Sequence, residues 1–465
     1  MRLPGLALSA ALAFALPQAA IAQDMPTTPA GKEALDILKQ IVAVPSVIGR
    51  GNVPKVAEII KARLVAGGFA PEDVTFTPVE GTDTGYLTAR YRGRDPKLKP
   101  VVINPHMDVV EANPADWARD PFTPVVENGY LYGRGSADDK GDLSMVVAAL
   151  IDLKRQGWVP SRDVILGASG DEETLMRSTA KLAEALRNAE LVLNADGGGG
   201  ELANDFTPIV YSVQAGEKTY ADLKLSITDE GGHSSRPGKF NAIGAMARAL
   251  AKIDAYKFPP QLSPLTKAYW QGAAPSAPAD VAPAMRAFAA NPADQAAIDT
   301  LSSHPEYVGL VRTTCVPTMV QGGHAANALP QSVTANVNCR IFPGTTRAEA
   351  RAIIQRLVDD DRVSVELTDD GSLEAPESPL RDDVMAAVAK AVHERVPGLV
   401  IVPSMSAGAS DSMYFRALGI PAYGVAATFM RPDDDFSHGL DERLPLATID
   451  PGVKQWETLL RTLLK

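Results

Sequence analysis

Short apolar runs alternate with amphipathic stretches through the first half of the chain. Apolar runs within 100–104, 163–168 and 190–194 predict strands that are buried on both faces. Between them, the stretches 141–155 and 179–188 repeat apolar residues at helical spacing and predict helices. Strands that alternate with helices in this way are typical of an α/β layered fold built on a central sheet.

The pattern changes near Tyr211. From 221 to 228, apolar residues alternate with polar ones, which predicts a half-solvated antiparallel strand. Strands at 313–321 and 332–341 follow a Pro- and Ala-rich stretch, 256–305, that predicts an irregular or helical insertion. After residue 343 the earlier alternation of strands and helices resumes. We therefore predict one discontinuous α/β domain with a mixed central sheet and an inserted α+β domain, with the bounds 23–214, 215–343 (inserted) and 344–465.

The first residues predict a targeting segment. Arg2 precedes an apolar run at 6–16, and Ala20-Ile21-Ala22 has the small-x-small pattern of a cleavage site. The apolar run is too short to span a bilayer, so we expect no stable membrane anchor. Residues 1–22 are therefore predicted to be a cleaved signal peptide, and the mature protein to be periplasmic or secreted.

Charge and cysteine content narrow the function classes. The chain of 465 residues carries 45 Lys and Arg against 56 Asp and Glu, a net charge of −11, which argues against nucleic-acid binding. Its two cysteines are Cys315 and Cys339. An oxidising compartment allows a disulfide between them, and two buried thiols are the alternative.

Ligand-type residues follow three predicted strands directly. His106 and Asp108 follow the first strand, Glu172 and Glu173 the second, and Asp196 the third. Ligands of open α/β sheets gather at the carboxyl ends of the strands, so these side chains are expected to meet. Such a cluster of negative charge repels itself unless a cation lies inside it. Carboxylate and imidazole ligands favour zinc, and they also suit manganese or cobalt.

Several motifs, in this order, resemble metallopeptidase family twenty, whose members include aminoacylases, glutamate and Gly-X carboxypeptidases, carnosine dipeptidase and succinyl-diaminopimelate desuccinylase. The resemblance covers essentially the whole mature chain and implies a dizinc exopeptidase-like catalytic domain with an inserted lid and dimerisation domain. It rests on the segments Pro105–Asp108, Tyr132–Gly141, Asp171–Glu173, Asn194–Gly198, Gly232–Ser235 and Ser437–Leu440.

The resemblance also implies a role for each residue of the site. Asp138 bridges two zinc ions and is followed by a cis peptide bond. Glu172 is the general base, and Asp108 holds the His106 ring in one tautomer. The remaining implied ligands are His106 and Asp196 for the first ion, and Glu173 and His438 for the second.

In the inserted domain, His233 resembles the histidine that reaches a neighbouring subunit's site and stabilises the oxyanion. Asn327 and Arg340 match the family's polar pair that binds substrate, and Arg340 would hold a substrate carboxylate. Gly408 begins a turn that resembles the one lining the carboxylate end of the cleft. These likenesses imply a homodimer that forms through the inserted domains.

Together the residues predict a zinc-dependent hydrolase that cleaves an amide bond in a small peptide or N-acyl-amino-acid substrate bearing a carboxylate. Within this resemblance, Asp196 is similar to the aminopeptidases and dipeptidases, whereas the segments Asn327–Pro330 and Ser437–Leu444 resemble Gly-X carboxypeptidase and the secreted N-acyl-amino-acid hydrolases. The alternatives are a catalytically silent member that binds zinc or substrate, and an esterase or deacylase on the same scaffold.

Overall fold

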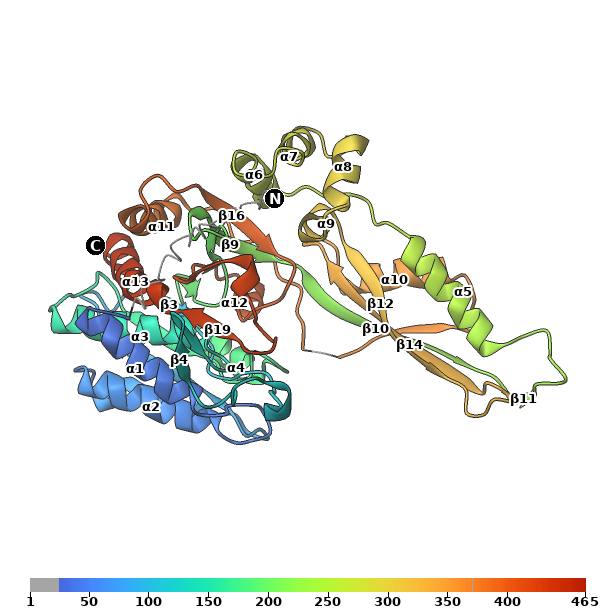
Figure 1. The fold of residues 1–465 in the computed structure, drawn as a ribbon, viewed down its shortest axis with the longest axis horizontal. Helices are drawn as coiled ribbons and strands as arrows, with labels where there is room; N and C mark the ends of the chain where they lie inside the picture. The colour runs from blue at the N-terminus through green and yellow to red at the C-terminus, as the bar shows by residue number, and fades with distance from the viewer. Residues whose placement is uncertain (1–24, 370) are drawn as a thin grey trace, which may run out of the picture.

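The computed structural model describes residues 25–369 and 371–465, so the predicted signal peptide lies outside the described residues. A ten-stranded mixed sheet forms the centre of the larger domain (Figure 1). Parallel pairs in its middle (β6 with β3, β3 with β7, β7 with β17) are flanked by antiparallel neighbours. In spatial order the strands are β1 (Val74–Pro78), β2 (Gly85–Tyr91), β6 (Val164–Ala168), β3 (Val101–Asn104), β7 (Leu191–Asn194), β17 (Ala422–Gly424), β9 (Pro208–Glu217), β8 (Gly199–Leu202) and β18 (Phe429–Met430), with β16 (Ile401–Ser406) paired to β9.

Helices cover both faces of this sheet. Val101 and Ile103 of β3 belong to one hydrophobic core, whereas Val102 belongs to another on the opposite face. This two-sided burial explains the continuous apolar runs and confirms the predicted α/β class. One face packs against α1 (Pro29–Val42), α2 (Val53–Ala66), α3 (Lys140–Arg155), α11 (Asp382–Arg395) and α13 (Ile449–Leu463), and the other against α4 (Arg177–Ala185) and α12 (Ser412–Ala417).

A second, antiparallel sheet extends away from the larger domain (Figure 1). Its strand order is β12 (Thr314–Gly322), β14 (Ser332–Ile341), β10 (Thr219–Thr228) and β15 (Ser364–Leu367), and α5 (Ala242–Ala255) and α10 (Arg347–Val358) pack on it. A disulfide bonds Cys315 to Cys339, which face each other on β12 and β14. Only Lys218 separates β9 from β10, so the two sheets follow each other directly in the chain.

The structure corrects the predicted bounds of the inserted domain. Residue 343 is not its end, because α10 and β15 belong to the second sheet's core through Ile354 and Val365. Part of the stretch 256–305 packs instead in the core of the larger domain, through Trp270 and Phe288. The helices of that region are α6 (Pro264–Ala273), α7 (Ala282–Ala290), α8 (Gln295–Ser302) and α9 (Pro305–Val311). The Pro- and Ala-rich composition predicted an irregular or helical insertion, but it did not indicate which sheet these helices pack against.

Two small sheets complete the fold. The strands β4 (Val125–Glu127), β5 (Tyr130–Tyr132) and β19 (Arg443–Pro445) form a three-stranded sheet that brings residues near 442 beside the loop after β5. The strands β11 (Gly232–His233) and β13 (Ala328–Leu329) pair at the far tip of the second sheet (Figure 1). No helix within 25–369 or 371–465 is long and apolar enough to cross a membrane.

Candidate metal centre and active site

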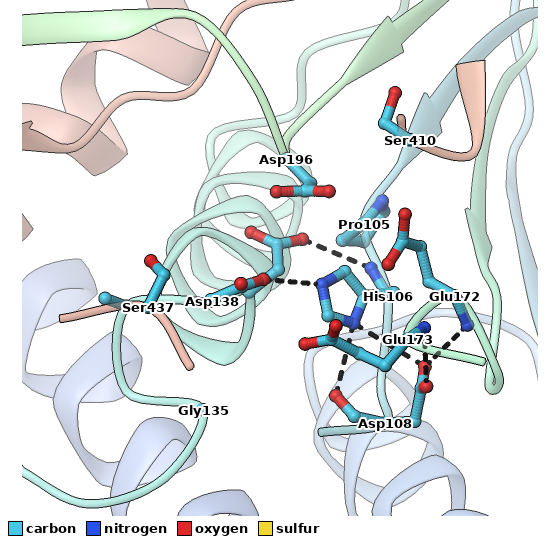
Figure 2. Close-up of polar contacts among 12 residues, drawn as sticks. Pro105, His106, Asp108, Gly135, Asp138, Glu172, Glu173, Asp196, Ser410 and Ser437 are labelled. Atoms are coloured by element: carbon cyan, nitrogen blue, oxygen red, sulfur yellow. Dashed lines mark hydrogen bonds and ion pairs between the residues drawn. The ribbon is translucent and has the colours of Figure 1, made fainter. Parts of the chain in front are cut away.

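The predicted ligands converge where the central strands end. Because β3 pairs in parallel with both β6 and β7, the carboxyl ends of all three strands lie at one edge of the sheet. His106, Glu172 and Asp196 follow these strands within a few residues, and Figure 2 shows them facing a common centre.

Two groups of side chains at this edge have the geometry to hold a metal ion. In each group, one ligand atom per residue lies within 4.8 Å of the others. The first group is His106, Asp138 and Glu173, and the second is His106, Glu172 and Asp196. His438 joins the first group, because its Nε2 lies 2.8 Å from Glu173 Oε2 and 3.3 Å from Asp138 Oδ2. The structure thus brings together all five predicted metal ligands and Glu172.

Asp108 lies beneath this cluster and is fully buried. Its carboxylate accepts hydrogen bonds from the backbone N–H groups of Glu172 and Glu173, both at 3.1 Å. His106 Nδ1 lies 3.1 Å from the Asp108 carbonyl oxygen and 3.5 Å from its carboxylate (Figure 2). With a proton on Nδ1, the ring presents its Nε2 lone pair to the centre of the cluster. Asp108 therefore orients three of the site residues at once.

The loop that carries Asp138 is held by a residue that the sequence did not single out, Glu442. Its buried carboxylate accepts hydrogen bonds from the backbone N–H groups of Gly135 and Ala137 at 2.9 Å and of Asp138 at 3.1 Å. Arg134 Nη1 donates to the same carboxylate at 2.7 Å. The peptide bond between Asp138 and Asp139 is cis, as the resemblance implies. A lone Glu four residues beyond His438 offered no sequence signal of this role.

A second missed residue is Asp411, at the end of the turn that begins at Gly408. Its buried carboxylate accepts hydrogen bonds from Asn104 Nδ2 at 3.1 Å and from the hydroxyls of Ser169 and Thr179 at 2.5 Å. Asn104 and Ser169 lie at the ends of β3 and β6, so Asp411 ties the turn to the strand ends that carry the site. Burial raises the pKa of Asp411 to about 6.

The electrostatics of the cluster favour a bound cation. Burial raises the pKa of Asp196 to about 8 and that of Glu172 well above its usual value, and neighbouring carboxylates add to both shifts. Burial also opposes ionisation of Asp138, but hydrogen bonds from His106 and His438 hold its pKa below the usual range. Hydrogen bonds to Asp138 and Glu173 raise the pKa of His438 to about 10. Buried carboxylates this close are stabilised in their ionised form by a positive ion among them.

The predicted substrate residues fall into two places. Arg340 is half-buried near the junction of the two sheets, where its Nη1 donates to the Ala407 carbonyl at 3.4 Å. It therefore lies beside Gly408 and the turn that ends at Asp411. Asn327 and His233 lie at the far tip, where the Ser234 N–H donates to the Asn327 carbonyl at 2.9 Å.

The strand β14 separates these two places by roughly 25 Å between Ser332 and Arg340. One chain therefore does not bring Asn327 to Arg340, and it leaves His233 exposed and distant from the metal cluster. The strand β14, which spans this distance, is paired with β10 on one side and β12 on the other. Rotation of side chains within one chain therefore does not bring Asn327 and Arg340 together.

Comparison with known proteins decides the family. Residues 102–462 match the model of Peptidase family M20/M25/M40. The chain belongs to this family. The match spans both parts of the larger domain and the inserted domain, and includes every candidate metal ligand described above.

Relatives of this M20 chain include one named as a carboxypeptidase and one named as a hydrolase of N-acyl amino acids. It is 27% identical, over 77% of its length and 71% of the relative's, to "Probable carboxypeptidase S-like 2" of Dictyostelium discoideum. It is 27% identical, over 78% of its length and 74% of the relative's, to an "N-fatty-acyl-amino acid synthase/hydrolase" of Homo sapiens. The predicted class of enzyme, a hydrolase of the metallopeptidase type, is confirmed.

Solved structures support the fold. An M20 family metallo-carboxypeptidase from Sulfolobus solfataricus superimposes with a TM-score of 0.72 at 19% identity, covering 93% of this chain and 99% of that one. The likeness extends over both domains, so the predicted dizinc-exopeptidase-like architecture with its inserted domain is confirmed at the level of the fold.

A pocket of about 450 Å³ opens directly beside the metal cluster of the M20 chain. Asp138, Asp196 and Ser437 line it. The glycine run Gly197–Gly200, which follows Asp196 in the sequence, forms another wall. The structure thus gives this glycine run a place at the cleft.

Proposed function

We propose that this M20 enzyme hydrolyses an amide bond in a small peptide or N-acyl-amino-acid substrate that carries a carboxylate, with two zinc ions as cofactor. The observation that carries the proposal is the pair of ligand groups that share His106, one of which contains Glu172. Glu172 is buried and its side chain faces the same centre as the ligands, a position suited to a general base.

The donor set fits two zinc ions. Asp138 offers one carboxylate oxygen toward His106, at 2.9 Å from Nε2, and the other toward His438. It is therefore suited to bridge one ion held by His106 and Asp196 and a second held by Glu173 and His438. Manganese or cobalt suits the same donors. When bound, such a metal pair supplies Lewis acidity and lowers the pKa of a water toward neutrality.

Glu172 is the proposed general base. Its backbone is fixed by Asp108 at 3.1 Å, and burial together with the neighbouring carboxylates raises its pKa, which suits a group that must accept a proton near neutral pH. In the proposed reaction its carboxylate takes a proton from the attacking water and then delivers that proton to the leaving amine nitrogen. Glu173 is one residue away, yet its side chain turns to His438 instead.

Arg340 and the turn from Gly408 to Asp411 are proposed to bind the substrate carboxylate. The Arg340 guanidinium lies over the Tyr220 ring at 4.6 Å and donates to the Ala407 carbonyl, so it is held at the edge of the site. A planar guanidinium in this position can hold a carboxylate through two parallel hydrogen bonds.

A homodimer is proposed to complete the site. His233 and Asn327 lie too far from the metal cluster to act in their own chain, and a second copy could bring them to it. The edge strand β12 supports this assembly, because Val316, Met319 and Val320 on it are 55%, 60% and 61% exposed. An exposed apolar edge strand is suited to pair with another chain.

A periplasmic or secreted location is also proposed, from the targeting pattern of residues 1–22 and the disulfide between Cys315 and Cys339, which suits an oxidising compartment. N-terminal sequencing of the exported protein tests it. A mature chain that begins near Gln23 supports cleavage, and an intact Arg2 on the exported protein would contradict it.

The main test is the Glu172→Gln variant, assayed with dipeptides, N-acyl amino acids and matched esters on zinc-loaded enzyme. Turnover is expected to fall by about 10²–10⁴-fold because the amide keeps the shape but loses the base. The metal content should stay unchanged. Glu111→Gln, on an exposed carboxylate paired with Arg50, is the control and should keep full activity. A loss below about tenfold in Glu172→Gln would remove Glu172 as the base.

The unmodified enzyme tests the two alternative functions. An enzyme that holds two metals but cleaves nothing in the panel would favour the catalytically silent alternative, and one that cleaves esters alone would favour the esterase.

The dimer is tested by complementation between two inactive variants, His233→Ala and Glu172→Gln. When subunits exchange, each mixed dimer has one site with Glu172 from one chain and His233 from the other, so activity is expected to return. Loss of an oxyanion donor costs about 10²–10³-fold in turnover, so the recovery is large enough to measure. Proven exchange without recovery would place His233 outside the neighbouring site.

A further inference from the structure

A second pocket, of about 330 Å³, shares one wall with the pocket beside the metal cluster. The shared wall consists of β8 and β18, which pair in parallel. Glu201 and Met430 of these strands line the pocket beside the metal cluster. Their neighbours Leu202 and Phe429 line the second pocket. Because successive side chains of a strand point to opposite faces, the two pockets lie on opposite sides of this strand pair.

The wall of the second pocket is mostly apolar. Three aromatic rings line it, those of Tyr130, Phe206 and Phe429. The Tyr130 hydroxyl donates to Asp434 at 3.0 Å, so its ring is the surface that remains for a ligand. Of the described residues that line this pocket, Arg395 alone carries a charge. A cavity with such a lining suits an apolar ligand that carries one negative group.

Arg395 is the last residue of α11, and neighbouring groups fix its guanidinium in place. The guanidinium lies over the Phe429 ring at 3.8 Å. Its Nη1 donates to the Ala427 carbonyl at 2.6 Å and to Gln455 Oε1 at 3.3 Å, and its Nη2 donates to Thr448 Oγ1 at 3.1 Å. These bonds leave the N–H of Nε and one N–H of Nη2 unused. Nε and Nη2 share one edge of the guanidinium, and such an edge can hold a carboxylate.

The charge of Arg395 is not neutralised by an ion pair. Within residues 25–369 and 371–465, all of its hydrogen-bond acceptors are uncharged oxygens. Burial lowers the pKa of Arg395 to about 10, so the side chain is still charged at neutral pH. Its Nε has no partner in the same part of the chain and is not fully buried, so a ligand can reach it. A partly buried charge of this kind is stabilised by an anion placed against it.

We propose that this pocket is a second binding site, separate from the metal cluster, for a compact apolar monocarboxylate that carries a ring. The carboxylate accepts hydrogen bonds from Nε and Nη2 of Arg395, and the ring packs against Tyr130 and Phe206. Contacts between aromatic rings add to the stabilisation that burial of the ring provides. The volume of about 330 Å³ is near the lower end of the roughly 300–1,000 Å³ of small-molecule sites, which favours a single ring on a short linker.

Calorimetry on the zinc-loaded protein tests this site with 3-phenylpropionate as the probe. Two further compounds each lack one of the groups that the pocket recognises. The amide 3-phenylpropanamide keeps the ring but has no negative charge, so it should bind at least about 10-fold more weakly. Propionate keeps the charge but has no ring, and it should also bind at least about 10-fold more weakly.

Two variants alter the pocket by independent routes. Arg395→Met removes the charge, whereas Ala447→Leu narrows the pocket from an exposed position and keeps Arg395. Each should weaken the binding of 3-phenylpropionate by at least about 10-fold. If Arg395→Met does not fold, Ala447→Leu alone decides the test. Arg187→Met, which removes an exposed arginine paired with Glu184, is the matched control and should bind the probe like the unmodified protein.

A carboxylate could also bind at the proposed substrate site, so Arg340→Met is measured with the same probe. Binding that persists in Arg340→Met and is lost in the two pocket variants supports the second site. Binding lost only in Arg340→Met, equal binding of the amide, or no binding of 3-phenylpropionate would each overturn the inference. Because calorimetry measures binding and not turnover, these outcomes are independent of whether the enzyme hydrolyses the proposed amide substrates.

Discussion

Glu442→Gln tests how the loop that carries Asp138 is held. The Glu442 carboxylate accepts two hydrogen bonds at each oxygen: Oε2 from Arg134 and Gly135, and Oε1 from Ala137 and Asp138. Glutamine keeps one oxygen and places an NH₂ group, which cannot accept, against the donors at the other. Two of the four bonds are lost, and Arg134, whose side chain is 3% exposed, loses the negative charge of its buried partner.

The expected cost follows from these contacts. Hydrogen bonds to a charged group contribute about 1.5–3 kcal/mol each, and removal of one partner of a buried ion pair costs about 3–5 kcal/mol. Because the two descriptions cover the same contacts, we expect the free energy of unfolding to fall by about 3–5 kcal/mol, not by their sum. Asp138 donates its own N–H to Glu442, so zinc affinity should also fall, by about 10–100-fold.

Urea unfolding of the metal-free protein, followed by circular dichroism, measures the first effect, and competition titration with a zinc chelator measures the second. Glu127→Gln, whose exposed carboxylate pairs with Arg119, is the matched control and should change stability by less than about 1 kcal/mol. Arg134→Met combined with Glu442→Gln should be less destabilised than the sum of the single variants, because no buried charge is then left alone. A change below about 1 kcal/mol in Glu442→Gln with unaltered zinc affinity would refute the assigned role.

Three further predictions concern the metals, the substrate carboxylate and a buried lysine. Metal analysis should find two divalent ions per chain, with activity lost on chelation and regained on reloading; full activity at one ion would contradict the paired site. Arg340→Met should raise KM for carboxylate substrates by about 10–100-fold with little change in kcat, and equal losses on a carboxamide analogue would exclude carboxylate binding. Burial lowers the pKa of Lys218 from 10.5 to about 7. Between pH 7 and 10.5 the unfolded chain therefore binds a proton at Lys218 that the folded chain does not, so the free energy of unfolding rises with pH, by up to about 1.4 kcal/mol per unit. Lys218→Met should remove this contribution, and identical pH profiles of stability for the two proteins would contradict the shift.

The position of the metal cluster could be predicted from the sequence because it depends on local pattern. Apolar runs too continuous for a one-sided sheet indicated that β3, β6 and β7 are buried on both faces and pair in the middle of the sheet. His106, Glu172 and Asp196 follow these strands directly, so parallel pairing alone brings them together.

Residues that support the site from a distance could not be found in this way. Glu442 and Asp411 bind loops that are more than 200 positions away in the chain, and neither lies in a periodic pattern or a recognisable spacing. The pairing of Cys315 with Cys339 depended likewise on the register between β12 and β14. A buried carboxylate looks like any surface carboxylate until the packing around it is known.

The assignment of helices to the two domains could likewise not be predicted from the sequence. The stretch 256–305 was predicted to be an irregular or helical insertion, yet α6 within it packs on the central sheet, whereas α10, beyond residue 343, packs on the second one. Periodicity along one segment records only that one of its faces is apolar. The partner of that face is chosen by shape and by the length of the connecting chain, and both exist only in the folded molecule. The sequence by itself therefore determined the elements, the strand ends and the chemistry of the ligands, while the tertiary structure decided which sheet each helix covers, which buried groups hold the site, and that His233 and Asn327 lie away from it.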